Sequence, residues 1–561
     1  MSNRNAVSAG GFALAAGVAA ILQMAHAQAG TIETGQPDLK VRWDNTFKYS
    51  AALRMKDPSQ NVAASYANPN VDAGDLALDK GLINNRVDWL TELDVAYQGM
   101  GARVSAAAWY DTVYNKSGND FPVSIPFPNT ANALTGGANN VFTPAAKKLM
   151  GRKAELADAF VYGSTDIGDG MGLSGRVGRH TQLYGETLFL GANGIAYAQG
   201  PVDLIKLFSL PGVQFKEIAL PVGQVSGNLQ INSDLSVGAY YQYQWRALRL
   251  PAAGSYFSPA DFVGDGADLL LTPVGGAASR AHDLEGRDSG QFGARVKFKV
   301  PGSEVEYGLY AAKYHDKSPI PVLTVTEPGA YNGGVYRLMY AQDVKVYGAS
   351  FSTLIGETNV GGEMSTRRDT PLAPLGDLVV NFDPTADNRK NSPYAVGNSF
   401  HANLSAITVL AANPLWDAGS FVGELAFNRL LSVTRNPVNP MFQNGVLNTT
   451  HTRDAWAMRM VFQPEYFQVL SGLDLQVPIG LGYGISGRSA VFQVAPEHGG
   501  DLSVGVNFDY KKTWRAGVQF THYIGAAGPA PSLDAAINTQ ASYKQYYKDR
   551  DFVTFSVQRT F

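Results

Sequence analysis

The chain has 561 residues, with 45 Lys and Arg against 48 Asp and Glu, 60 Gly, 27 Tyr, 27 Phe and no Cys. Only 17% of the residues are charged, against about 25% in a typical soluble protein. The net charge of −3 excludes a nucleic-acid-binding protein held by bulk basic charge, and the absence of Cys excludes thiolate metal sites, iron–sulfur clusters, disulfides and cysteine nucleophiles.

Residues 1–27 are predicted to be a secretory signal. Arg4 is their only charged residue, an apolar stretch runs from Phe12 to Leu22, and Ala25-His26-Ala27 fits the small-x-small cleavage rule. The alternative is a membrane anchor, but the apolar stretch is shorter than the roughly 20 residues that a spanning helix needs. We therefore expect the mature protein, residues 28–561, to leave the cytoplasm.

From residue 39 onward, apolar and polar residues alternate with a period of two in about eighteen runs of roughly 9–13 residues. In the first run, Trp43, Phe47 and Tyr49 fall on one face, and Arg42 and Lys48 fall on the other. Runs of this length and pattern are typical of tilted strands that cross a bilayer. A soluble β-sandwich or propeller is the alternative, but no repeat with a propeller period is visible.

The connections between the runs alternate between short and long. Short connections lie at 99–101, 232–233, 301–303, 356–358 and 511–512, and long ones at 56–85, 115–155, 181–221, 250–287, 316–342, 369–398, 431–451, 486–500 and 525–548. Outer-membrane barrels have short periplasmic turns and long extracellular loops, and a sheet in hydrocarbon must close on itself. We therefore predict an all-β, antiparallel transmembrane barrel of about 18 strands, with 16 as the alternative.

The final run ends in an aromatic residue. Val553, Phe555, Val557 and Phe561 share one face of it. A terminal aromatic after an alternating strand resembles the signal read by the outer-membrane barrel assembly machinery. We therefore expect this machinery and the lipids of the outer membrane to be partners of the chain.

The polar face of the first strands carries charges of both signs, which predicts a polar lumen wall. The alternative is that neighbouring strands merely pair their charges inside a wide barrel, and mixed signs argue against strong ion selectivity. Further inward charges are expected at Arg295, Lys297, Glu306, Glu363, Arg367 and Glu424. The predicted wall residues are Arg42, Lys48, Asp88, Glu92, Asp94, Arg103, Trp109 and Asp111.

The third long connection, 181–221, is too apolar for a water-exposed loop. We predict that it folds into the barrel and narrows the lumen, with a short helix over 201–208 that has Pro201 at its start. The alternative is packing on neighbouring loops outside the lumen. The residues expected to shape the constriction are Arg179, His180, Tyr184, Glu186, Asn193, Asp203 and Lys206.

Enzyme motifs are scarce. The sequence has no GxSxG, no HExxH and no phosphate-binding loop, and its eight His residues show no pair at ligand spacing. We therefore expect no catalytic residue, no cofactor and no metal site. A Ser/His hydrolase stays open, because such residues can meet only in the fold.

Several segments resemble a bacterial family, the domain-of-unknown-function family 1302. They are residues 85–94 and 101–111, the motif at 176–186 with its continuation 191–203, and the segments 347–352 and 549–561. Tyr184 stands where the family usually has Trp. The resemblance implies outer-membrane proteins of Gram-negative bacteria, which often accompany a second exported family and inner-membrane transporters of the resistance–nodulation–division type. It also implies a neighbourhood of genes that degrade hydrophobic or aromatic compounds, and it supplies no catalytic residues.

The sequence thus predicts a porin-like channel for small organic solutes, hydrophobic or aromatic ones among them, in the outer membrane of a Gram-negative bacterium. One alternative is a docking component that works with a periplasmic partner and an inner-membrane resistance–nodulation–division pump. A second alternative is an outer-membrane hydrolase. Nucleic acid is not an expected partner.

Overall fold

The computed structural model describes residues 30–63, 69–123, 129–134, 138–210, 212–272, 276–329, 331–372, 377–437, 451–491, 495–530 and 541–561. The predicted signal at 1–27 lies outside these residues. No helix among them is long and apolar enough to span a membrane.

The strands form a closed antiparallel barrel, as predicted, with eighteen strands. Each barrel strand pairs with the next barrel strand along the chain, and the last one, β25, closes the barrel on β2 with Ser50 opposite Ser556. A short strand β1 (Gly30–Ile32) pairs with β2 outside this ring. The barrel strands are β2 (Leu39–Arg54), β3 (Gly81–Tyr97), β4 (Met100–Asp111), β5 (Arg152–Gly168), β6 (Met171–His180), β7 (Val222–Asn232), β8 (Leu235–Gln242), β11 (Gln291–Lys299), β12 (Glu306–Tyr314), β15 (Val344–Ile355), β16 (Thr358–Pro371), β18 (Val396–Leu410), β19 (Ala418–Arg435), β20 (Asp454–Leu470), the interrupted strand β21 (Leu473–Gln476) and β22 (Ile479–Ser486), β23 (Gly500–Tyr510), β24 (Trp514–Ile524) and β25 (Phe552–Thr560).

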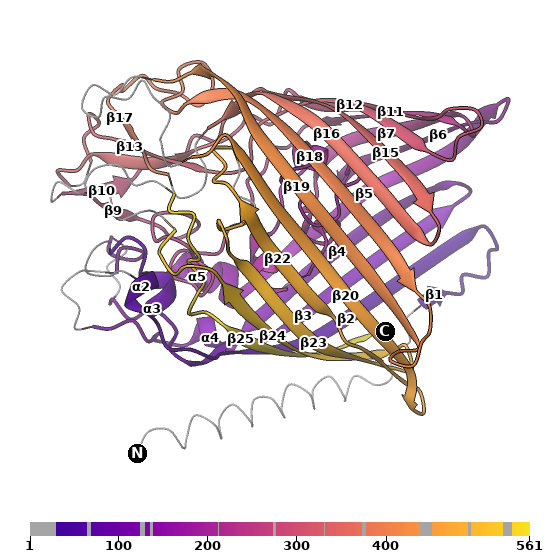
Figure 1. Ribbon diagram of the computed structural model, residues 1–561, viewed down its shortest axis with the longest axis horizontal. Coiled ribbons are helices and arrows are strands. Elements are labelled where there is room, and N and C mark those ends of the chain that lie inside the picture. Colours follow the sequence, from indigo (N-terminus) through magenta and orange to yellow (C-terminus); the bar gives the residue numbers. More distant parts are fainter. Residues whose placement is uncertain are drawn as a thin grey trace.

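The barrel has two different ends, which we call the turn end and the loop end. Short hairpin turns gather at the turn end, on the right in Figure 1, together with β1 and the C-terminus. The long connections gather at the loop end, on the left in Figure 1. This asymmetry is the one expected of an outer-membrane barrel.

Alternate residues of each strand point to the outside of the barrel, and these outward residues are mostly apolar. Trp43, Val104 and Leu173 are 50%, 47% and 45% exposed there. The residues between them point inward and are polar, as Asp88 and Trp109 show by facing each other across β3 and β4. A lipid-facing apolar surface around a polar interior therefore follows directly from the period-two pattern.

The loop end carries a second sheet that the sequence analysis did not predict. Its order is β17-β13-β14-β10-β9, and Leu270, Leu323 and Tyr336 are buried in the cluster beneath it. Three of its strands have only three or four residues, too few for the alternation to be recognised. The strands are β9 (Leu269–Leu271), β10 (Ala277–Arg280), β13 (Ile320–Thr324), β14 (Val335–Met339) and β17 (Val379–Asn381).

Short helices and a buried ion cluster also cover the loop end. Asp75 accepts a hydrogen bond from Arg54 at 2.7 Å and one from Arg550 at 3.1 Å, and all three side chains are almost fully buried. This cluster ties the end of β2 to the loop before β25. The helices are α2 (Gln60–Ala63), α3 (Ala73–Leu76), α4 (Thr112–Asn115), α5 (Pro144–Ala146) and the π-helical turn η1 (Lys147–Gly151).

Candidate functional site

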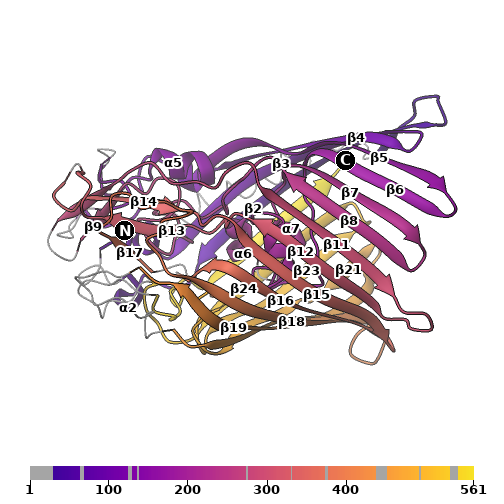
Figure 2. The same cartoon turned by 90° about the horizontal axis from the view of Figure 1, so that it is seen from above.

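The connection 181–221 folds into the barrel, as predicted from its apolar composition. It leaves β6 at His180 and returns to β7 at Val222, which pair with each other. Between them it forms η2 (Ile195–Ala198), α6 (Leu204–Ser209) and α7 (Phe215–Ile218). Figure 2 shows α6 and α7 within the outline of the barrel. We call residues 181–221 the lumen loop.

Two buried carboxylates on the far wall hold the first half of the lumen loop. Glu363 on β16 accepts hydrogen bonds from the backbone N–H groups of Glu186 at 2.6 Å and Ile195 at 2.8 Å. Glu424 on β19 accepts from the N–H groups of Phe189 at 2.6 Å and Leu190 at 2.8 Å. Because an unpaired buried N–H or carboxylate is costly, these contacts fix the loop across the lumen.

Asn193 is the second attachment point and is completely buried. Its amide nitrogen donates to Asn403 Oδ1 at 2.8 Å and to the carbonyl of Phe427 at 3.0 Å. Arg367 on β16 donates to the carbonyls of Ala192 and Gly194 at 2.8 and 3.0 Å. The lumen loop therefore reaches β16, β18 and β19, which lie five to seven strands away from β7 around the ring.

Tyr184 and Glu186 fix the loop where it leaves the wall. The Tyr184 ring packs against Tyr240 at 5.5 Å, and the Arg295 guanidinium lies 4.9 Å from its centroid. Lys297 Nζ lies 3.3 Å from a carboxylate oxygen of Glu186. Burial, the first cause, raises the pKa of the Tyr184 hydroxyl to about 12, so it stays protonated at neutral pH.

The predicted helix is present as α6, but its predicted start at Pro201 is wrong, because the helix begins at Leu204 and Asp203 caps it. The Asp203 carboxylate accepts from the N–H groups of Ile205 and Lys206 at 3.0 and 3.2 Å. Its second oxygen pairs with Arg249 at 2.8 Å, and Arg249 also binds Glu155 on β5. A capped helix is thus fastened to the near wall by one bridging arginine.

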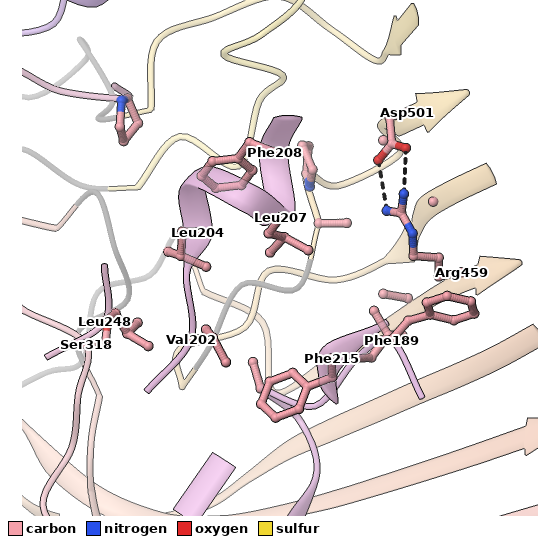
Figure 3. Close-up of a pocket in the computed structure, with 18 of the residues that line it drawn as sticks. Phe189, Val202, Leu204, Leu207, Phe208, Phe215, Leu248, Ser318, Arg459 and Asp501 are labelled. Atoms are coloured by element: carbon pink, nitrogen blue, oxygen red, sulfur yellow. Dashed lines mark hydrogen bonds and ion pairs between the residues drawn. The ribbon is translucent and has the colours of Figure 1, made fainter. Parts of the chain in front are cut away.

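A cavity of about 230 Å³ lies between the lumen loop and the wall of β20 to β24. Figure 3 shows apolar side chains from the loop lining it, with the Arg459–Asp501 ion pair on the opposite side. The two groups of this pair are 3.0 Å apart. The apolar residues labelled in Figure 3 are Phe189, Val202, Leu204, Leu207, Phe208, Phe215 and Leu248.

The predicted wall residues lie on β2, β3 and β4, and many of their charges pair with neighbours, as the alternative interpretation expects. Their role as the wall of a passage stays a prediction, and Asp111 is only 1% exposed because it caps α4. Arg103 pairs with Glu92 and lies 3.7 Å from Asp158. Arg42 pairs with Asp44 at 2.6 Å. Other inward contacts involve Lys48 facing Asp88, Asp94 accepting from the Tyr162 hydroxyl, Trp109 donating to the Leu149 carbonyl, and Asp111 accepting from Asn84.

The predicted constriction residues fall into three places. Tyr184, Glu186 and Asn193 contact the strands from β8 to β19, while Asp203 caps α6 and Lys206 lies on it, near β2 to β5. Arg179 belongs to this second group, because its charge acts on Arg246 and Asp158. His180 is different: it is 1% exposed in the wall and hydrogen-bonds Ser226, so it does not line the constriction.

Two Ser–His contacts bear on the hydrolase alternative. His180 Nε2 lies 2.8 Å from Ser226 Oγ, and His401 Nε2 lies 2.8 Å from Ser399 Oγ. Ser226 and Ser399 are only 7% and 0% exposed, so neither hydroxyl is open to an acyl substrate. Among the described residues, no group of three or more His, Asp or Glu residues is placed to hold a metal ion.

We expect Glu424→Ala to loosen the lumen loop, because it leaves the N–H groups of Phe189 and Leu190 without an acceptor. The cost is about 1–3 kcal/mol for each buried group left unsatisfied. The measurement is proteolysis within residues 186–210 of the purified barrel, which should be faster than in the wild type. Glu357→Ala, at an exposed turn between β15 and β16, is the control and should leave the rate unchanged. An equal rate in both variants would show that Glu424 does not hold the loop.

A family model described as a protein of unknown function, DUF1302, matches residues 10–561. The chain belongs to this family. No curated protein matches it. Among solved structures, OpdK from Pseudomonas aeruginosa is 10% identical with a TM-score of 0.38, covering 93% of this chain and 98% of that one.

Two further structures have similar values. OccAB1 of Acinetobacter baumannii is 10% identical with a TM-score of 0.39, covering 96% of this chain and 99% of that one. The outer-membrane channel DcaP of Acinetobacter baumannii is 8% identical with a TM-score of 0.35, covering 95% and 100%. Similarities this low do not bear on the solute or on individual residues.

Proposed function

We propose that this DUF1302 member is an outer-membrane channel through which small organic molecules diffuse, with no bond broken. The observation that carries the proposal is the lumen loop, which crosses a closed barrel and encloses a largely apolar cavity beside the Arg459–Asp501 pair. On the other side of the loop, Arg86 and Lys153 keep 22% and 26% of their side chains exposed inside the barrel. An apolar cavity together with a polar wall suits amphipathic solutes better than bare ions.

The proposal places the turn end in the periplasm and the loop end outside the cell. Export by a secretory signal, surrounding outer-membrane lipids and insertion by the barrel assembly machinery belong to the same proposal. The class of solute then depends on the lumen surface, and the direction of net diffusion follows the concentration gradient of the solute.

Single-channel recording tests the channel directly. Purified protein in a planar bilayer should give discrete conductance steps in potassium chloride, because an 18-strand barrel narrowed by one loop still has a wetted, charged wall. Heat-denatured protein at the same concentration is the control. A correctly folded barrel that never conducts would overturn the proposal.

A docking role is the second candidate, and apolar side chains at the turn end favour it. Val409, Leu415 and Leu470 are 64%, 71% and 68% exposed there. Such a surface suits a periplasmic partner that links the barrel to an inner-membrane resistance–nodulation–division transporter. In this role the lumen loop would serve as a plug, and the absence of conductance in the experiment above would favour docking.

A further inference from the structure

A cluster of cations lies on the opposite side of α6 from the cavity. The segments 202–208 and 246–250 run side by side, since Leu204 donates its N–H to the Arg249 carbonyl at 2.9 Å and Arg249 donates to the Val202 carbonyl at 3.0 Å. Leu204 and Leu248 line the cavity. The Arg249 side chain instead points away from the cavity and pairs with Asp203 and with Glu155 on β5. The paired segments thus have one apolar face and one charged face.

Too few carboxylates neutralise the charged face. Glu155 alone faces three cations: it binds Arg249, and its Oε2 lies 3.3 Å from Lys153 and 3.9 Å from Arg246. Asp203 pairs only with Arg249, and its other oxygen caps α6. The next carboxylates along the wall are already used, because Asp88 pairs with Arg86 and Asp158 lies by Arg103.

More cations adjoin these without ion pairs of their own. Lys206 on α6 acts electrostatically on Lys48 of β2, and Arg179 acts on Arg246. Across the described part of the chain, none of these three residues, Lys48, Lys206 and Arg179, has a carboxylate oxygen within ion-pair distance. We call Lys48, Lys153, Arg179, Lys206, Arg246 and Arg249 the cationic cluster.

Arg246 shows most clearly that the positive charges of the cluster are not fully neutralised. It lies in the loop after β8, and burial together with the charges of Arg249 and Arg179 lowers its pKa to about 10. It is therefore still protonated at neutral pH, in surroundings that repel its charge. Its side chain remains 22% exposed, so a molecule inside the barrel can reach it. An anion placed there would relieve this repulsion.

The Trp109 ring packs against two members of the cationic cluster, Lys153 and Arg249. The Lys153 ammonium lies 5.8 Å from its centroid, and the Arg249 guanidinium lies 5.9 Å from it. Cation–π contacts of this kind hold the cationic groups together despite their repulsion. The indole N–H donates to the Leu149 carbonyl, which fixes the ring.

We propose that the cationic cluster binds the anionic group of a solute as it passes α6, so that the preferred solutes are small organic anions such as carboxylates. This inference rests on the proposed channel function and names its substrate class. It also refines the expectation from the mixed charges of the sequence. The charges nearly balance over the whole chain, but the lumen beside α6 has an excess of cations.

Calorimetric titration of the detergent-solubilised barrel tests the site without requiring conduction. Benzoate is the probe, and benzyl alcohol and benzylamine are neutral and cationic molecules of similar size. We expect benzoate to bind and benzylamine not to. The double substitution Arg246→Gln and Lys206→Gln should weaken benzoate binding by at least about tenfold, because charge-assisted hydrogen bonds are lost. Equal binding of benzoate and benzyl alcohol, or unchanged binding in the variant, would overturn the site.

The variant should fold, because Arg246 loses only its 3.9 Å pair with Glu155, which keeps Arg249 and Lys153, and Lys206 has no ion pair in the described part of the chain. Heat-modifiable mobility on a gel checks this. Lys345→Gln is the matched control: Lys345 is 45% exposed and alternates with the inward, buried Val346, so it lies outside the lumen. It should bind benzoate like the wild type, and weakening equal to that of the double variant would overturn the site.

Reversal potentials in a potassium chloride gradient separate this inference from the channel proposal. A conducting wild type should prefer chloride, and the double variant should lose that preference while Lys345→Gln keeps it. A barrel that conducts without anion preference or benzoate binding refutes the anion site and leaves the channel standing. A barrel that binds benzoate but never conducts refutes the channel and leaves the anion site standing.

Discussion

Replacing residues 186–210 with a short Gly/Ser linker is expected to raise the single-channel conductance by at least about twofold, because an 18-strand barrel without an inward loop encloses an open aqueous lumen. His180 and Val222 pair directly, so a shorter connection still closes the β6–β7 hairpin. The replacement removes α6, η2 and the groups bound by Glu363 and Glu424. Conductance is measured in planar bilayers under identical salt.

The control for this replacement is the connection between β13 and β14, residues 325–334, which belongs to the second sheet at the loop end. The same linker placed there should leave conductance unchanged. We call the second sheet and the short helices at the loop end the loop-end cover. If both replacements raise the conductance equally, the loop-end cover rather than the lumen loop limits the current. If neither does, the passage avoids the lumen loop altogether.

The barrel could be predicted because side chains of a membrane strand alternate between lipid and lumen every two residues. Each pair of neighbouring residues therefore shows this alternation in the sequence. Trp43 and Arg42 on β2 already assign the lipid and lumen faces, and β25 repeats the pattern with Val557 and Ser556. Alternation also placed Glu363, Arg367 and Glu424 inside. Local sequence therefore determines which way a strand residue points.

The period-two alternation does not predict which inward-pointing residues contact one another. Thr187 donates to Glu363, which lies 176 positions later, and Asn193 donates to Asn403, which lies 210 positions later. Such contacts depend on the path of the lumen loop across the barrel. The sequence does not separate His180 from the constriction residues beside it, but His180 pairs with Ser226 in the wall.

The cavity pair Arg459–Asp501 was missed for a similar reason. The two residues lie on β20 and β23, and the strand between them contributes Gly482, where an added Cβ would lie 2.7 Å from Arg459 Nη1. A glycine in the intervening strand lets the guanidinium lie over the backbone and reach the second carboxylate. Charge on strands two apart, separated by a glycine, is a signal that could have found this pair.

Asp75→Ala is expected to destabilise the loop-end cover by about 3–5 kcal/mol, because it removes the shared carboxylate from two buried guanidinium groups. Arg54 and Arg550 are 0% and 2% exposed at the side chain. They also donate to backbone carbonyls, Arg54 to Leu78 and Arg550 to Ser258, so the ion cluster holds three separate segments of the cover. The measurement is hydrogen exchange of the amides around 72–78 and 256–262.

The size of the destabilisation by Asp75→Ala depends on the neighbouring carboxyl group of Asp549. Burial, and after it the like charge of Asp75, raises the pKa of the Asp549 carboxyl above its usual range. Removing Asp75 removes that repulsion and lowers the pKa again, which leaves Asp549, 3.6 Å from Arg54, as a partial replacement partner at neutral pH. The loss should therefore be larger at pH 4, where a larger fraction of the Asp549 carboxyl is protonated and cannot pair with Arg54, than at pH 7. Asp454→Ala, which breaks an exposed pair with Arg429, is the control and should change exchange little at either pH. An Asp75→Ala loss independent of pH would mean that Asp549 does not compensate, and unchanged exchange would mean that the cluster does not hold the cover.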